Sequence, residues 1–186
     1  MTYADLSVAE FLRAVAAREP APGGGAVAAM SVALAAALAA MAARFSPGME
    51  DLAERADLLR AEVLPLADAD AVAYGRVLAA YRMPGDAPER PGQIATALSE
   101  AADIPLAVAE IGAEVASIGA HVLDAGHATL RGDALAAVRM AGAGVRTAAA
   151  LARLNLAQAG IADDRERRAG TAVAIAVAAE KRADHL

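Results

Sequence analysis

The sequence contains no cysteine and no tryptophan, and aromatic residues make up only 3% of its 186 positions. Without cysteine the chain forms no disulfide, iron–sulfur cluster, thiolate zinc site or cysteine nucleophile. The apolar 58% of the chain must therefore consist mainly of Ala, Leu, Val, Ile and Met. That composition favours helix over strand, so we expect an all-α protein. The absence of cysteine also suits a reducing compartment, and we expect a cytoplasmic protein.

An excess of positive charge is also missing, since 23 acidic residues outweigh 17 basic ones. Nucleic-acid binding would need a basic patch or stripe, so no nucleic-acid partner is expected. Residues 1–10 lack the basic start of a signal peptide. Residues 26–43 are uncharged and about long enough to span a bilayer. Alanine is only weakly apolar and no aromatic anchors flank this stretch, so we expect a buried helix and no membrane partner.

Helical signals cover most of the chain. Ser7 and Glu10 form a capping-box pattern that starts a first helix ending near Arg18. Further helices are expected over residues 26–45, 50–81, 93–118, 133–159 and 164–183, with a short helix in 119–126. Pro65 should kink the helix over 50–81, and Pro105 lies inside the helix over 93–118. Asp133 is expected to be the N-cap of the helix over 133–159. The second helix is apolar on every face, which is typical of a bundle centre. Residues 1–186 are thus expected to form one domain, a multihelical bundle around this alanine-rich helix.

Three consecutive glycines, Gly23–Gly25, follow Pro20-Ala21-Pro22 and lead directly into the alanine-rich helix. Such glycines serve either a turn with φ > 0 or a close approach of another group to the backbone. A helix beginning here would offer free N–H groups and a partial positive charge to an anion. The spacing alone leaves a simpler interpretation open, namely a tight turn that lets the central helix enter the core.

Two carboxylates, Asp68 and Asp70, lie two positions apart and so point to different sides of their helix. The apolar steps at positions 59, 63 and 66 continue through 70, 73 and 77, which places Asp70 on the apolar face. A carboxylate there needs a partner or an upward pKa shift, and in the second case it can act as general acid or base. Tyr74 follows one turn later on nearly the same face. The alternative is an Asp paired with an arginine or exposed at a bundle end.

A metal site is not expected. His121, Asp124 and His127 share about one side of a helix, but only if that helix persists to Gly126. Two histidines and one aspartate without a further cluster are a weak signal for a metal ion.

These stretches, taken in order, resemble the cyclodeaminase domain of formiminotransferase-cyclodeaminases and the stand-alone methenyltetrahydrofolate cyclohydrolases of the same family. The resemblance rests on Glu10-Phe11-Leu12, on the run from Pro20 to Ala29 and on the run from Asp68 to Tyr74. It continues at Met83-Pro84, Glu100-Ala101, Pro105-Leu106, Ala109-Glu110, Asp133 and Arg153-Leu154-Asn155. It therefore covers nearly the whole chain.

The resemblance implies an all-α homodimer that acts on a small-molecule tetrahydrofolate substrate without a metal or redox cofactor. It implies either hydrolysis of 5,10-methenyltetrahydrofolate or cyclising deamination of 5-formiminotetrahydrofolate. No formiminotransferase domain accompanies these residues, which tilts the expectation toward hydrolysis. The alternative is a divergent, non-catalytic helical dimer that binds another small molecule or acts as a scaffold.

Catalytic roles follow from the resemblance, not from spacing. It implies that Asp70 is the acid/base, with Asp68 as the second choice and Tyr74 beside it.

Substrate-binding roles are implied in the same way. The three glycines, Gly23, Gly24 and Gly25, would lie against the pterin or the glutamate tail. Asp133 would hydrogen-bond the pterin, and Arg153 would pair with a glutamate carboxylate. Asn155 would also contact the substrate.

The sequence departs from the family pattern where polar residues are expected. Gly85 replaces a lysine, Gly132 replaces a serine and Leu151 replaces an asparagine.

Overall fold

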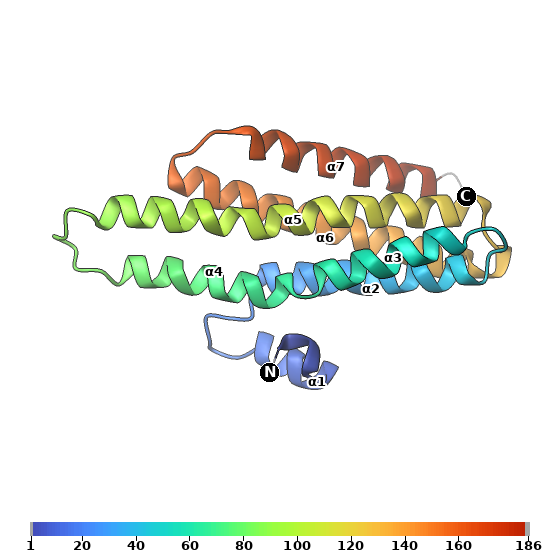
Figure 1. Ribbon diagram of the computed structural model, residues 1–186, viewed down its shortest axis with the longest axis horizontal. Helices are drawn as coiled ribbons and strands as arrows, with labels where there is room; N and C mark the ends of the chain where they lie inside the picture. The colour runs from blue at the N-terminus through green and yellow to red at the C-terminus, as the bar shows by residue number, and fades with distance from the viewer. Residues whose placement is uncertain (1, 185–186) are drawn as a thin grey trace.

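Helices account for the architecture, and residues 2–184, which this computed structural model describes, contain no strand, confirming the all-α prediction (Figure 1). The elements in chain order are η1 (Tyr3–Asp5), α1 (Val8–Val15), α2 (Gly24–Arg44), α3 (Glu50–Val63), α4 (Leu66–Tyr81), α5 (Arg90–Ala125), η2 (Ala128–Leu130), α6 (Arg131–Ala159) and α7 (Asp164–Ala183). The capping box that starts α1 is present, because Ser7 and Glu10 each accept the other's backbone N–H.

Two prolines that look alike in the sequence act differently. At Pro65 the expected single helix is in fact two helices, since α3 ends at Val63 and α4 begins at Leu66. A proline lacks the N–H for the bond to residue i−4 and its ring crowds that carbonyl, which breaks the helix. At Pro105 the helix continues, and α5 also runs through the expected break at Gly119 to Ala125.

The start of α6 also differs from the prediction. Leu130 is the N-cap, and Asp133 lies inside the first turn instead of capping the helix. A carboxylate in the first turn is still favourable, because it faces the positive end of the helix dipole.

The core depends on small side chains that let α2, α5 and α6 approach closely. Val32 of α2 packs against Gly112 of α5 and Gly144 of α6. A Cβ on Gly112 would lie 2.7 Å from a methyl of Val145 and 3.0 Å from a methyl of Val32, and a Cβ on Gly144 would lie 2.7 Å from Val32. All twelve buried residues of α2 are Ala, Gly or Val. The predicted multihelical bundle around the alanine-rich helix is confirmed, and α2 is buried except along an outer side that includes Val27 and Leu34.

Within residues 2–184, three helical segments are long and apolar enough to cross a membrane by length and composition, namely 24–44, 90–125 and 128–159. In the first two, more than half of the most apolar window is buried inside the protein. Packing in the core thus accounts for the high hydropathy of α2.

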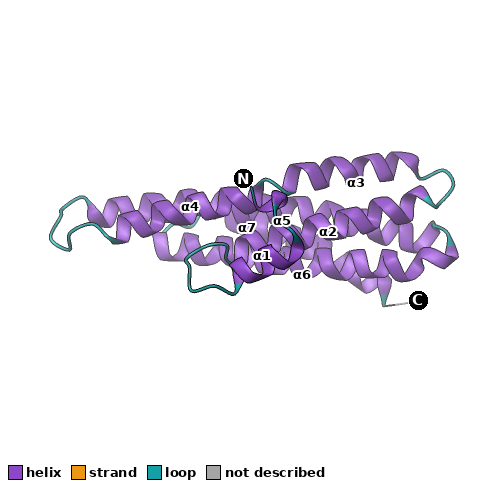
Figure 2. Cartoon of the chain, turned by 90° about the horizontal axis from the view of Figure 1, so that it is seen from below, coloured by secondary structure: helices purple, strands orange, loops and turns teal. Residues whose placement is uncertain are grey.

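The lengths of the helices leave the centre of the bundle unfilled at one end. α2 has 21 residues and α5 has 36, which correspond to about 32 Å and 54 Å of helix. α3 packs mainly on α2, whereas α4 packs mainly on α5, and the α4–α5 pair extends beyond the start of α2 (Figures 1 and 2). A small second core of Val77, Leu98 and Ala101 forms in that extension.

The close packing of α2, α5 and α6 makes a stability prediction. Gly112→Ala is expected to destabilise the protein by about 1–2 kcal/mol, because overpacking costs roughly 1–3 kcal/mol and the better helix propensity of alanine returns up to about 1 kcal/mol. Gly75→Ala is the matched control, since nothing lies within 4 Å of a Cβ at this position in α4. It should stabilise by about 0.5–1 kcal/mol in urea unfolding. Equal gains at both positions would show that the helix approach is not tight.

Candidate functional site

A cavity of about 290 Å³ lies where α2 begins. Its walls come from the loop before α2, the first turn of α2, and one face each of α4, α5 and α6. Ala101 of the small second core is one of the lining residues, so the cavity borders that core. A concave apolar space with a few convergent polar groups is the usual form of a ligand site.

The carboxylate of Asp70 lies directly against the backbone of Gly25. A Cβ on Gly25 would overlap this carboxylate, whereas one on Gly23 would meet nothing within 4 Å and one on Gly24 only Leu151, at 3.5 Å. In residues 2–184 only Gly48 and Gly160 have positive φ. Of the two explanations for the glycine run, close approach therefore applies, and it applies at Gly25.

The environment of Asp70 favours its protonated form. Burial raises the pKa of Asp70 above the ordinary value for aspartate, while a hydrogen bond from the backbone N–H of Ala26 opposes that shift. No ion pair joins Asp70 to a basic side chain in the part of the chain that the structure describes, so it is not the arginine-paired aspartate that the sequence left open. A partly buried carboxylate without a cationic partner takes up a proton more readily than an exposed one, which suits a general acid or base.

Asp68 lies outside the cavity and has a different contact. Its Oδ1 accepts the backbone N–H of Tyr3 at 3.0 Å, which fixes the N-terminal segment to the first turn of α4. Sequence reasoning missed Tyr3, which no periodic pattern includes. Burial raises the pKa of Tyr3, and the negative charges of Asp68 and Asp70 add to the shift. The Tyr3 ring also meets Phe11 edge-on, with the centroids 5.8 Å apart.

Three further side chains complete the cavity. Tyr74 lies one turn after Asp70 and is 44% exposed, so it forms part of the mouth. Asn155 of α6 donates its Nδ2 to the carbonyl oxygen of Ala101 at 3.0 Å. Leu151 lies one turn before Asn155 and covers the first turn of α2. The structure thus brings together six of the nine predicted site residues, namely Gly23, Gly24, Gly25, Asp70, Tyr74 and Asn155.

Besides Asp68, Asp133 and Arg153 do not line this cavity. Arg153 is exposed, and its guanidinium lies beside Gly170 of α7. It is two residues from both Leu151 and Asn155, which places it on the other side of α6. Asp133 is 22 residues before Asn155 on the same helix, about 33 Å away. Within one chain, neither residue lies at the Asp70 cavity, and their contacts with a substrate stay predictions.

Only one of the three departures from the family pattern touches the cavity. Leu151 lines it, whereas Gly85 lies in the loop between α4 and α5 and Gly132 lies in the first turn of α6. Leu151 makes one wall apolar but leaves the polar side chains of Asp70, Tyr74 and Asn155 in place.

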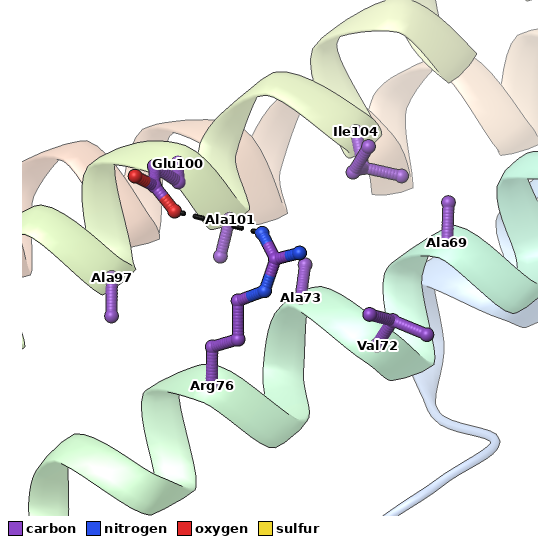
Figure 3. Close-up of a pocket in the computed structure, with 8 residues that line it drawn as sticks. All are labelled: Ala69, Val72, Ala73, Arg76, Ala97, Glu100, Ala101 and Ile104. Atoms are coloured by element: carbon purple, nitrogen blue, oxygen red, sulfur yellow. Dashed lines mark ion pairs between the residues drawn. The ribbon is translucent and has the colours of Figure 1, made fainter.

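A second hollow of about 250 Å³ lies between α4 and α5, and Ala101 lines both it and the first cavity (Figure 3). Its labelled side chains are apolar except for Arg76 and Glu100, which point toward each other across the hollow and form an ion pair at 3.7 Å. Both charges are therefore used within the protein. The cavity at Asp70 is the better candidate because its carboxylate has no cationic partner.

In the described residues 2–184, no group of three or more His, Asp or Glu side chains is placed to hold a metal ion. Asp124 instead pairs with Arg182 of α7. The ring of His127 contacts the hydroxyl of Thr129 at 2.7 Å.

Comparison with known proteins gives consistent matches. Residues 7–174 match the family model described as formiminotransferase-cyclodeaminase. The chain is similar to the formimidoyltransferase-cyclodeaminase of Mus musculus, with 37% identity over 114 residues that cover 56% of this chain and 21% of that protein. It therefore spans about a fifth of the length of that relative.

Two other matches extend over most of both chains. A methenyltetrahydrofolate cyclohydrolase of Methylorubrum extorquens is 30% identical over 157 residues, which cover 77% of this chain and 76% of that protein. The crystal structure of a formiminotetrahydrofolate cyclodeaminase from Thermotoga maritima superposes with a TM-score of 0.86 at 28% identity, covering 98% of this chain and 96% of the other.

The position of Asp70 predicts a pH-dependent effect on stability. The folded state raises the pKa of Asp70, so stability is lost as pH rises from about 4 through the raised pKa. Asp70→Asn removes this loss and can still accept the Ala26 N–H. Its melting temperature should exceed that of the unmodified protein by a few degrees at pH 7, and the gain should shrink as pH falls toward 4.

Asp86→Asn, on the exposed loop after α4, controls for removal of one negative charge. A gain at Asp70→Asn that stays constant between pH 4 and 7 would contradict the prediction.

Proposed function

Because the chain belongs to the formiminotransferase-cyclodeaminase family, we propose that it acts on a tetrahydrofolate that carries a one-carbon unit between N5 and N10. The observation that carries this proposal is the partly buried carboxylate of Asp70, held against the start of α2 and facing a ligand-sized cavity. Both reactions named for the relatives need proton transfer beside one carbon atom, and this carboxylate is placed to provide it.

Hydrolysis of 5,10-methenyltetrahydrofolate is the favoured reaction. The relative named as a cyclohydrolase is 30% identical and matches across about three quarters of both chains. Cyclising deamination of 5-formiminotetrahydrofolate is the second candidate, favoured by the close structural match to the protein named as a cyclodeaminase.

Asp70 would move one proton in the hydrolysis. The methenyl group is a cationic N–C–N unit, so an ionised carboxylate beside it stabilises the bound substrate. The oxygen of water adds to the methenyl carbon while Asp70 accepts one proton from that water. The bond between the carbon and N5 then breaks, Asp70 returns the proton to N5, and the second proton of the water is released. The product is the 10-formyl compound, and no step needs an oxidant or a reductant.

The size and lining of the cavity fit part of a folate. A volume of about 290 Å³ is at the low end for ligand pockets, so it would hold the ring and the one-carbon unit, with the glutamate tail outside. The first turn of α2 has no side-chain cap, which leaves the backbone N–H groups of Gly24 and Gly25 as donors for a ring oxygen or nitrogen. The hydroxyl of Tyr74 lies at the mouth and can hydrogen-bond the adding water.

We further propose that the protein forms a homodimer through the outer face of α2. Val27, Leu34 and Phe45 are spaced along one side of this helix and are 37%, 56% and 65% exposed. Several large apolar side chains exposed along one side of a helix are typical of an interface between protein chains.

The first test of the proposal is the turnover of 5,10-methenyltetrahydrofolate, followed by loss of its near-ultraviolet absorbance above the spontaneous rate. Asp70→Asn is expected to lower kcat by roughly 100- to 10,000-fold, the usual contribution of a general acid or base, while remaining folded. The non-catalytic alternative would be favoured if the protein turned over neither this substrate nor the formimino compound and if folates did not raise its melting temperature.

The glycine run gives a second prediction. Gly25→Ala should lower kcat/KM by at least about ten-fold, because the added methyl displaces the Asp70 carboxylate from the end of α2. Gly23→Ala is the matched control, since its methyl meets nothing within 4 Å. Steady-state kinetics that show the two variants equally active would mean that the contact with Gly25 does not position Asp70.

A further inference from the structure

Pro105 leaves one backbone carbonyl of α5 without its usual partner at the wall of the cavity. In an α-helix the N–H of residue 105 would bond to the carbonyl oxygen of residue 101, and proline has no N–H. The carbonyl of Ala101 faces α6, and Ala101 and Pro105 both line the cavity. Leaving a backbone carbonyl unpaired in a partly buried place is costly, so the site needs an outside donor.

Asn155 supplies that donor. Its Nδ2 lies 3.0 Å from the carbonyl oxygen of Ala101, across the space between α5 and α6. Because a carbonyl oxygen can only accept a hydrogen bond, the NH2 group of Asn155 must face it, and the flipped orientation with Oδ1 toward Ala101 is excluded. The bond thus fixes which end of the side chain meets α5 and which end is left for the cavity.

The free end of Asn155 is a hydrogen-bond acceptor. In residues 2–184 no protein donor meets its Oδ1, and the side chain itself lines the cavity with Asp70. An acceptor in a fixed orientation discriminates well between ligands, since a partner without an N–H or O–H leaves it unsatisfied.

We propose that Asn155 is a positioning residue, anchored by the Ala101 carbonyl that Pro105 leaves free, so that its Oδ1 accepts an N–H of the reduced pterin ring and aligns the one-carbon unit with Asp70. This inference rests on the proposed folate activity. The inference also gives a role to the proline inside α5. If residue 105 had an N–H, the Ala101 carbonyl would bond to it within the helix and would not hold the Asn155 amide in place.

Four proteins test the inference as a cycle: the unmodified chain, Asn155→Ala, Pro105→Ala and the double variant. Asn155→Ala should lower kcat/KM for methenyltetrahydrofolate by about ten-fold or more, and Pro105→Ala should lower it too, because an N–H at position 105 takes over the Ala101 carbonyl and releases the amide. The double variant should lose no more than Asn155→Ala alone. The pH–rate profile should keep its shape in all four, since neither residue titrates.

The melting temperature separates anchoring from general damage. Asn155→Ala should lower it when residue 105 is proline, and should lower it much less when residue 105 is alanine, because the carbonyl then has a helical partner. Gln158→Ala, an exposed amide on the same helix, is the control for loss of a polar side chain. Losses in kcat/KM that multiply in the double variant, or an Asn155→Ala variant within two-fold of the unmodified protein, would overturn the inference.

Failure of the proposed function gives a different result. If the unmodified protein turns over neither folate substrate, the function is wrong, while the melting temperatures of the four proteins still decide whether Asn155 is anchored by the carbonyl that Pro105 frees. Equal effects of Asn155→Ala in both backgrounds would reject that anchoring in either case.

Discussion

The contact between three helices without large side chains is the constraint on which the structure depends. Val32 can sit between α5 and α6 only because Gly112 and Gly144 face it. That contact holds α2 against α5 and α6 in the core. α2 is shorter than α5 and α6, and the candidate cavity lies beside its first turn.

The position of the site explains its electrostatics. The first turn of α2 presents N–H groups and a partial positive charge to a space surrounded by apolar helices. Asp70 uses one of these N–H groups, from Ala26, yet burial still raises its pKa. The helix end holds the carboxylate in place, and burial keeps it ready to take up a proton. The two effects come from different parts of the fold, and Gly25 is the position at which they meet.

Much of the fold was accessible from the sequence because its signals are local or periodic. The capping box at Ser7, the apolar character of α2 and the three- and four-residue steps that place Asp70 inward were all readable. The different outcomes at Pro65 and Pro105 were not, because local sequence does not show tertiary contacts. Asn155, 54 residues after Ala101, donates to the carbonyl that Pro105 leaves free. Asp68, Asp133 and Arg153 were assigned by resemblance, which carries residue types but not the direction in which they point. For Arg153, the two-residue step from Leu151 would have shown that the two side chains lie on different sides of the helix.

The alanine core has a consequence for how this sequence can diverge. At a fully buried alanine or glycine of α2, α5 or α6, nearly every substitution adds volume, and overpacking in a closed core destabilises the protein. Single changes at these positions are therefore purged unless a neighbouring residue shrinks at the same time. Packing sets no such limit at positions such as Gly85 and Gly132, where an added Cβ meets nothing within 4 Å. Two relatives with this fold should then share small residues in the centre of the bundle long after their loops have lost all similarity.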